Sequence, residues 1–231
     1  MTVVVPTLLA HSKDELDALT TRYVPFAKRI HLDLMDGQFT PTPSVTVPEI
    51  VLPTEWEVDV HMMYADPLTN LPPVIAMKPS LIIIHAEAQG ELMKGVEAIQ
   101  KANIKAGLAL MRSTVPADVA ELLAVVDHVL IFSGNLGEYG GTANMLQIEK
   151  IRLIREINPA IEVGWDGGAN ISNTYTLSLG GVDVVNVGNA LASAPDPAEV
   201  YRQLDFEAHR KDVLQQQKTK AEAQKEAAEN Q

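Results

Sequence analysis

Two short runs, His31-Leu32-Asp33 and Asp59-Val60-His61, lie at the ends of successive segments rich in β-branched and apolar residues. In an extended strand the side chains alternate between two faces, so His31 and Asp33 point the same way. His61 arrives from the neighbouring strand, and Asp166 stands further on in Trp165-Asp166-Gly167-Gly168. These two imidazoles and two carboxylates could meet around one divalent metal ion.

The same kind of apolar run recurs along the chain. Eight strands are expected: Val3–Leu9, Arg29–Leu34, Glu57–Met63, Leu81–Glu87, Lys105–Leu110, His128–Ser133, Ile161–Trp165 and Val182–Val187. Between them, capping residues and helical spacing predict helices: 13–23 after the Ser12 cap, 66–77, 91–102, 116–125, 143–157, 172–179 and 197–204. The segment after the second strand is rich in proline and threonine, so its helix is expected to be short or absent.

Strands that alternate with helices run parallel, because each helix carries the chain back to the start of the next strand. Eight such units in about 200 residues predict an α/β fold, a closed (β/α)8 TIM barrel. A doubly wound open sheet is the alternative, but it favours a glycine-rich turn after the first strand, where this chain has Leu9-Ala10-His11-Ser12. We expect one barrel domain over residues 1–205 and a charged Gln/Lys/Glu/Ala-rich tail, helical or disordered, over 206–231.

Composition narrows the function classes. The 231 residues are 46% hydrophobic and carry a formal charge of −12, which argues against nucleic acid and anionic membranes as partners. The absence of cysteine removes disulfides, thiolate nucleophiles and cysteine-ligated zinc. With no signal peptide or membrane span indicated, a cytoplasmic location is expected.

In a (β/α)8 barrel the active site lies at the C-terminal ends of the strands, and the polar residues of this chain gather there. Lys28 and Lys105 fall at strand starts instead, so a Schiff-base mechanism lacks a nucleophile. His85 with Glu87 is expected to support the site rather than to bind metal.

The chemistry that this group supports is enolisation. The positive charge of a metal ion stabilises the negative charge that develops on the oxygen of a substrate carbonyl during enolisation. If Asp33 and Asp166 approach from opposite sides, one can remove a proton from a carbon and the other can return one to the opposite face, which gives the epimer.

A phosphate on the substrate would need an anion site. The glycine-rich turns Gly140-Gly141, Gly167-Gly168 and Gly188-Asn189 could supply backbone N–H donors for it. Met35 and Met63 follow the metal-site residues of their strands and could either cover the substrate or fill the core.

These residues resemble the ribulose-phosphate 3-epimerase family. The resemblance runs in order through most of residues 3–194, on Pro6-Thr7-Leu8-Leu9-Ala10, Ile30-His31-Leu32-Asp33-Leu34-Met35-Asp36-Gly37, Val58-Asp59-Val60-His61-Met62-Met63, Ile84-His85-Ala86-Glu87, Lys105-Ala106-Gly107-Leu108-Ala109-Leu110, Asp166-Gly167-Gly168 and Gly181-Val182-Asp183. It implies a (β/α)8 barrel and a divalent metal, one of Zn, Fe, Mn or Co, on His31, Asp33, His61 and Asp166. It also implies acid/base roles for Asp33 and Asp166 in the interconversion of ribulose 5-phosphate and xylulose 5-phosphate.

The chain departs from the family pattern in the loops expected to contact the substrate. The departures are at Ala10, Thr42, Met111-Arg112, Gly134–Gly141 and Trp165. Three function classes therefore stay open. The first is a 3-epimerase of ribulose 5-phosphate or of another ketose phosphate, and the second is another isomerase, decarboxylase or lyase on a phosphate-binding barrel. The third is a non-catalytic barrel that binds a sugar phosphate or a protein partner. The expected partner is a small phosphorylated sugar, and a homo-oligomer is possible.

Overall fold

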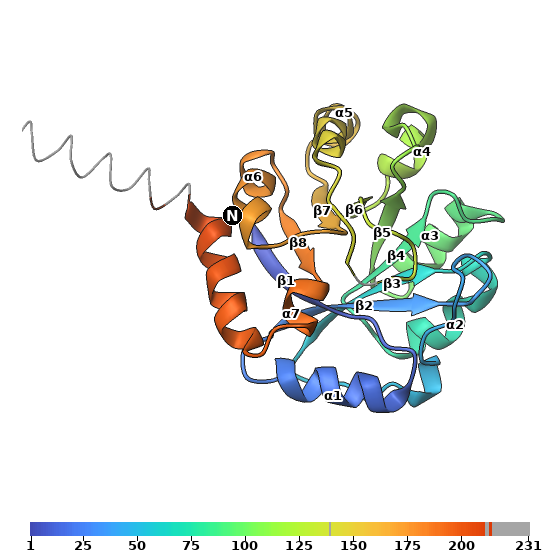
Figure 1. The fold of residues 1–231 in the computed structure, drawn as a ribbon. Helices are drawn as coiled ribbons and strands as arrows, with labels where there is room; N and C mark the ends of the chain where they lie inside the picture. The colour runs from blue at the N-terminus through green and yellow to red at the C-terminus, as the bar shows by residue number, and fades with distance from the viewer. Residues whose placement is uncertain (139, 211–212, 214–231) are drawn as a thin grey trace, which may run out of the picture.

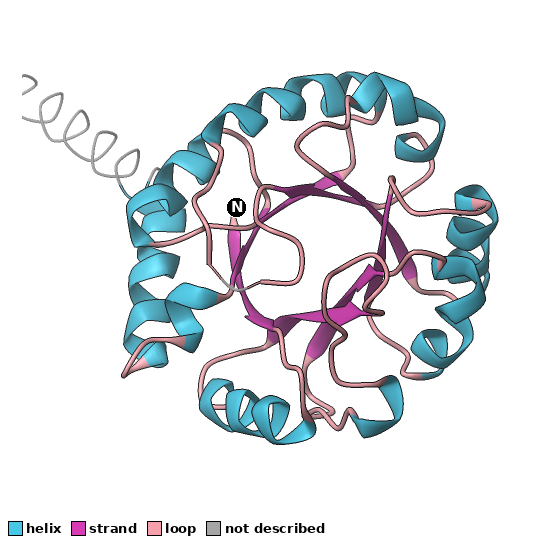
Figure 2. Cartoon of the chain, turned by 45° about the vertical axis from the view of Figure 1, so that its right-hand side comes forward, coloured by secondary structure: helices cyan, strands magenta, loops and turns pink. Residues whose placement is uncertain are grey.

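The computed structural model of the protein describes residues 1–138, 140–210 and 213. Eight parallel strands close into a barrel in sequence order, so the predicted (β/α)8 fold is confirmed (Figures 1 and 2). The strands are β1 (Val3–Leu8), β2 (Arg29–Met35), β3 (Glu57–Met63), β4 (Leu81–His85), β5 (Lys105–Leu110), β6 (His128–Phe132), β7 (Glu162–Asp166) and β8 (Val184–Val187).

Helices surround the ring of strands (Figure 2). They are α1 (Lys13–Tyr23), α2 (Pro67–Ala76), α3 (Leu92–Lys101), α4 (Ala120–Leu123), α5 (Lys150–Ile157), α6 (Ile171–Leu179) and α7 (Asn189–Ala192), with 3-10 helices at Val47–Glu49, Pro116–Val119 and Met145–Glu149. As predicted, the Ser12 side chain caps α1 by accepting from Glu15 N, and the segment after β2 forms just one short 3-10 helix. The short α7 was not predicted.

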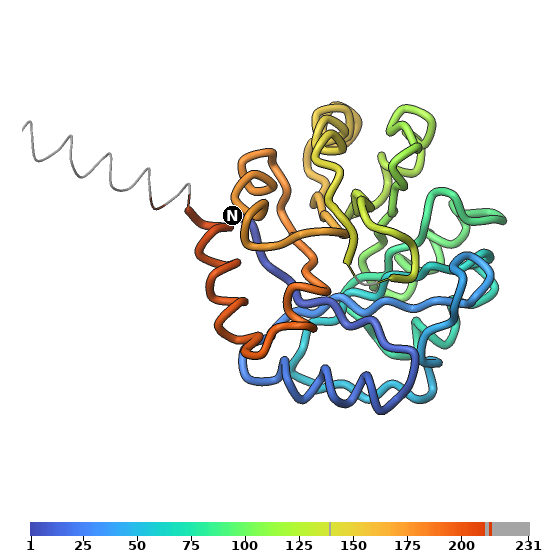
Figure 3. The backbone as a smooth tube through the Cα atoms, in the orientation of Figure 1, coloured from blue at the N-terminus to red at the C-terminus, as the bar shows by residue number. Residues whose placement is uncertain are grey.

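A further helix over residues 197–210 extends beyond the predicted end at 204, because Leu204 and Ala208 lie one turn apart and are both buried. Ser178 Oγ of α6 donates to Ala208 O, and the Tyr201 ring packs on Phe26 with centroids 4.9 Å apart. This helix lies beside the start of β1 in Figure 3. It runs through the predicted boundary at residue 205; apart from residue 213, the rest of the predicted tail lies outside the described residues.

The main apolar core fills the space between the strands and the helices. Inside the barrel a smaller cluster of Leu81, Ile83, Ala109 and Leu130 fills the middle. Gly164 of β7 leaves room for a neighbouring ring, because a Cβ there would lie 2.5 Å from His128 Nε2. The interior is therefore packed, and a ligand can enter only at an end of the barrel.

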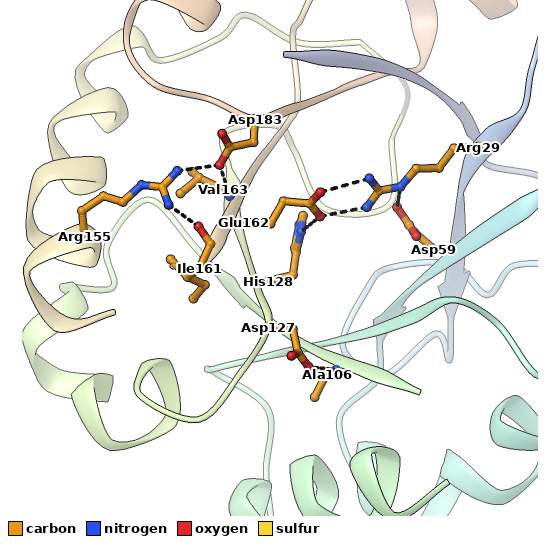
Figure 4. Close-up of polar contacts among 10 residues, drawn as sticks. All are labelled: Arg29, Asp59, Ala106, Asp127, His128, Arg155, Ile161, Glu162, Val163 and Asp183. Atoms are coloured by element: carbon orange, nitrogen blue, oxygen red, sulfur yellow. Dashed lines mark hydrogen bonds and ion pairs between the residues drawn. The ribbon is translucent and has the colours of Figure 1, made fainter. Parts of the chain in front are cut away.

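Charged side chains close the N-terminal end of the barrel (Figure 4). Arg29 donates from Nε to Asp59 Oδ2 at 2.7 Å and reaches across to both carboxylate oxygens of Glu162, at 3.1 and 2.9 Å. His128 Nδ1 lies 2.8 Å from Glu162 Oε2. At the same end Asp127 and Asp183 each accept a backbone N–H from a neighbouring strand. This end is thus a structural ion-pair network, and the open end is the opposite one.

Candidate metal centre and active site

Four buried polar side chains converge at the C-terminal ends of β2, β3 and β7. They are His31, Asp33, His61 and Asp166, and one donor atom from each lies within 4.8 Å of all the others. The register places Asp33 directly beside His61, and His31 and Asp33 share a face because they are two residues apart on β2. The structure therefore brings together all four residues that the sequence pointed to.

The donor atoms fit a metal ion in kind and in spacing. His61 Nδ1 lies 2.9 Å from Asp33 Oδ1, and His31 Nε2 lies 3.3 Å from the same oxygen. Adjacent ligands about 2.0–2.2 Å from one metal ion stand roughly 3 Å apart, so these separations suit a shared ion. Both His31 nitrogens are buried and have no hydrogen-bond partner among the described residues. A buried imidazole of this kind calls for a further partner, and a cation would provide it.

A chain of side chains behind His61 fixes its orientation. His61 Nε2 lies 2.9 Å from His85 Nε2, and His85 Nδ1 lies 3.0 Å from Glu87 Oε2. Glu87 Oε1 in turn accepts from Met111 N at 2.8 Å and from the Thr114 hydroxyl. Burial lowers the pKa of His85 to about 4, so its ring is neutral near pH 7. His85 thus supports His61 from behind, in the manner of residues that orient metal-ligating histidines.

The two carboxylates of the group have opposite pKa shifts. Burial acts to raise the pKa of Asp33, but the adjacent His31 and His61 rings lower it to about 2. Burial and then the charge of Asp33 raise the pKa of Asp166. Neighbouring environments that separate two carboxyl pKa values favour one ionised and one protonated group, which suits paired acid and base roles.

A cavity opens directly above the cluster, and Asp33 and Asp166 lie in its wall. Most of the residues predicted to bind substrate or phosphate also line it: Met63, Gly140, Gly141, Gly167, Gly168, Gly188 and Asn189. Met35 is not in the wall. It is buried beside Leu9 and Met63, and a Cβ on Gly137 would lie 3.3 Å from its Sδ. Met35 therefore packs in a buried cluster in this structure, and its contact with substrate stays a prediction.

Two glycines of the loop after β7 bring this loop against the loop after β6. Gly167 and Gly168 have φ of 100° and 73°, in the left-handed region. A Cβ on Gly167 would lie 2.0 Å from Gly134 N, and one on Gly168 would lie 2.2 Å from Ala143 N. Both positions therefore require glycine, and the close approach of the two backbones forms one side of the cavity.

The loops that depart from the family pattern are tied together by two cationic side chains. Arg112 donates from Nε to Ser133 O at 2.9 Å and from Nη2 to Gly134 O at 3.2 Å. Lys150 Nζ donates to Met111 O at 2.6 Å. Glu138, from the same set of departures, lines the cavity. Arg112 thus joins the loop after β5 to the loop after β6, and Lys150 holds the loop after β5 from α5.

Sequence reasoning missed several residues of the cavity. They include Thr7, Phe132, Asn135, Asn170 and Asn186. Asn186 had a usable signal, because it is a polar residue within the apolar strand Val184–Val187. Thr7 and Asn135 lie within segments that sequence reasoning singled out for other reasons, and Phe132 and Asn170 lie in a strand and a turn where their residue types are common.

A closed (β/α)8 barrel with a buried His/Asp group and a glycine-lined cavity at the C-terminal ends of its strands defines a TIM-barrel enzyme. No helix in the described part of the chain is both long and apolar enough to span a bilayer. Residues 3–192 match the model of the Ribulose-phosphate 3 epimerase family. The chain belongs to this family, and it is an enzyme of the isomerase class.

Curated relatives agree with this assignment, and a solved structure agrees with the fold. The chain is 32% identical to the chloroplastic ribulose-5-phosphate-3-epimerase of Arabidopsis thaliana, over 75% of this chain and 65% of that protein. It is 33% identical to the ribulose-phosphate 3-epimerase of Synechocystis sp., over 74% of this chain and 78% of the relative. The 3-hexulose-6-phosphate synthase of Salmonella typhimurium has a similar fold, with a TM-score of 0.71, 17% identity, and coverage of 91% of this chain and 99% of that one.

Proposed function

We propose that the protein epimerises a ketopentose phosphate at C3, converting D-ribulose 5-phosphate to D-xylulose 5-phosphate. One observation carries the proposal: Asp33 and Asp166, from β2 and β7, face one cavity with pKa values shifted in opposite directions. Epimerisation needs one group that removes a proton and another that delivers one. Family membership and the names of the relatives support the same reaction.

In this proposal Asp33 is the ionised carboxylate that takes the proton from C3. Asp166, whose pKa is raised by burial and by the neighbouring charge of Asp33, returns a proton to the opposite face of C3. Between these two steps the sugar is an enediolate, whose negative charge develops on the oxygen of C2, beside the oxygen of C3. In the reverse direction the two carboxyl groups exchange roles.

His31, Asp33, His61 and Asp166 would hold one divalent cation, with Zn, Fe, Mn or Co all compatible with two imidazoles and two carboxylates. The bound cation would supply positive charge that favours the enediolate over the ketone. His85 and Glu87 keep His61 in the orientation that ligation needs.

The phosphate would lie against the loops after β6, β7 and β8. Gly140, Gly141, Gly167, Gly168 and Gly188 place backbone close to the cavity without side chains in the way. Backbone N–H groups would let a chain of net charge −12 bind an anion. A cysteine-free chain that acts on a phosphorylated metabolite fits the cytoplasm, which is the location we propose.

A second candidate is the 3-epimerisation of another ketose phosphate, such as a ketohexose 6-phosphate. It is favoured by Glu138, an acidic residue that lines the cavity from the loop that departs from the family pattern. An acidic group repels a nearby phosphate but accepts hydrogen bonds from hydroxyls, so a longer polyol chain would suit it.

The test is proton NMR of ribulose 5-phosphate in deuterated water with metal-loaded protein. Deuterium entry at C3 together with xylulose 5-phosphate would support the proposal. Exchange without epimer would leave one working base and direct the search to the ketohexose 6-phosphate. A metal-loaded protein that gives neither signal with either sugar would contradict the epimerase proposal.

A further inference from the structure

Asn186 is a buried amide within the last strand of the barrel. Its exposed fraction is 2%, and both Nδ2 and Oδ1 lack a hydrogen-bond partner among the described residues. It lies within β8 between Val185 and Val187, where an apolar side chain would suit the strand. An unpaired buried amide destabilises a fold, so its presence calls for an explanation outside the packing of the barrel.

The side chain faces the candidate active site. Asn186 lines the same cavity as Asp33 and Asp166. β7 pairs with β8 with Trp165 opposite Val185, so the next position along places Asp166 beside Asn186, with both side chains inside the barrel. Two residues further along β8 the chain reaches Gly188, in the wall that we assign to the phosphate. Asn186 therefore lies between a group that acts on the reacting carbon and the phosphate end of the cavity.

The chemistry of the amide limits what can pair with it. Nδ2 donates and Oδ1 accepts, so a single group can pair with both atoms only if it both accepts and donates. A phosphate oxygen accepts but does not donate, and a metal ion would use Oδ1 alone. A substrate hydroxyl does both.

We propose that Asn186 is a specificity-determining residue that binds the hydroxyl group on the substrate carbon between the reacting carbon and the phosphate-bearing carbon. In a ketopentose 5-phosphate this is the C4 hydroxyl. The inference rests on the proposed function for the placement of C3 and of the phosphate. It adds a requirement that the epimerisation itself does not make, namely a hydroxyl at C4.

The test compares two enzymes on two ligands. The enzymes are the metal-loaded wild type and Asn186→Val, and the ligands are ribulose 5-phosphate and its 4-deoxy analogue, which keeps the ketone, the C3 hydroxyl and the phosphate. We expect removal of either the amide or the hydroxyl to lower kcat/KM by about 10- to 100-fold, and removal of both to cost no more than removal of one. If Asn186 had a merely structural role, Asn186→Val would instead lower kcat/KM for both substrates by the same factor.

Val184→Ala is the matched control. Val184 is the preceding inward residue of β8, is buried, and does not line the cavity. This change should alter kcat/KM for the two substrates by the same factor. Asn186→Ala serves as a second variant if valine alters the strand, and thermal unfolding reports whether each variant is folded.

Calorimetric binding of both ligands separates this inference from the proposed function. The wild type could bind ribulose 5-phosphate without epimerising it. If removal of both the amide and the hydroxyl then weakens binding no more than removal of one, the inference stands and the proposed reaction is wrong. If the wild type epimerises but Asn186→Val weakens both ligands equally, or neither, the inference is overturned and the reaction stands. A wild type that neither binds nor turns over either ligand overturns both.

Discussion

His61 and His85 face each other through their Nε2 atoms, 2.9 Å apart. One of the two nitrogens must carry the hydrogen, and the surroundings decide which. The pKa of Glu87 is lowered: burial acts to raise it, but the hydrogen bonds from His85 and Thr114 outweigh that effect, so Glu87 is a carboxylate that accepts from His85 Nδ1. The neutral His85 then accepts at Nε2, and His61 donates from Nε2. In this tautomer the lone pair of His61 Nδ1, which lies 2.9 Å from Asp33 Oδ1, would be available to a metal ion held between the two atoms.

Glu87→Gln tests this orientation. Loss of the carboxylate removes the fixed acceptor for His85 Nδ1, so His61 is no longer held with its Nδ1 lone pair toward the cluster. We expect metal affinity to fall by about 10- to 100-fold, measured by competition with a chelator. Glu97→Gln, in an exposed ion pair of α3 with Lys101, is the control and should leave affinity unchanged. Equal affinities for the two variants would argue against the role of Glu87.

His61 and His128, two buried histidines at opposite ends of the barrel, should have different roles: His61 in metal binding and His128 in the stability of the fold. His61→Ala should lower the metal content of the purified protein, because it removes a proposed ligand. His128→Ala, in contact with Glu162 at the closed end, should lower the unfolding temperature and leave metal content unchanged. Elemental analysis and thermal unfolding of both variants check this. Stoichiometric metal in the folded His61→Ala variant would refute the proposed ligand set.

Asp33→Asn and Asp166→Asn should each abolish epimer formation, since each removes one of the two proton-transferring groups. The amide has nearly the same shape as the carboxyl group, so both variants should fold. Quenched-flow or NMR measurement of product gives the rate, and metal analysis of the same samples shows whether ligation was also lost. Epimer formation at the wild-type rate in both variants would exclude the two-base mechanism.

The ion-pair network at the closed end should make stability depend on pH. Burial acts to raise the pKa of Glu162, but His128 and Arg29 hold it well below its ordinary value of 4.5. A carboxyl whose pKa is lowered on folding stabilises the protein fully above its unfolded-state pKa, and this contribution is lost as the pH falls toward the folded-state pKa. Glu162→Gln should therefore reduce the free energy of unfolding by about 1–2 kcal/mol near pH 7, and the difference from wild type should shrink below about pH 4.5.

Urea unfolding from pH 7 to pH 3 measures both effects. Glu156→Gln, in an exposed pair with Arg152, provides the comparison and should change stability little at any pH. A Glu162→Gln difference that stays constant as the pH falls would show that the ionised form of Glu162 is not what stabilises the fold.

Asn186→Val should stabilise the substrate-free protein while it impairs the enzyme. Replacement of an unpaired buried amide by an apolar side chain of similar size removes a desolvation cost of about 1 kcal/mol. Urea unfolding without ligand should give a higher midpoint for the variant. A lower midpoint would show that the amide already has a stabilising partner in the free protein.

Much of the fold was determined by the sequence itself. Alternation of apolar strands with capped helices identifies the parallel barrel, because each helix must return the chain to the same end. The predicted ends of strands and helices were less accurate, because local contacts determine where an element ends. β4 ends at His85 rather than Glu87, since Glu87 turns away to accept from Met111 N, and the helix over 197–210 continues because Ala208 is buried on the barrel.

For the site, the sequence by itself determined which side chains could meet. His31 and Asp33 share a face of one strand, His61 ends the next, and closure of the barrel brings Asp166 to the same end. The tertiary structure alone decided what surrounds them. The separation of the Asp33 and Asp166 pKa values, the support of His61 by His85, and the position of Asn186 beside Asp166 depend on burial and on contacts between strands far apart in the chain. Such contacts leave no periodic pattern in the sequence, because they join single residues across the barrel rather than neighbours along it.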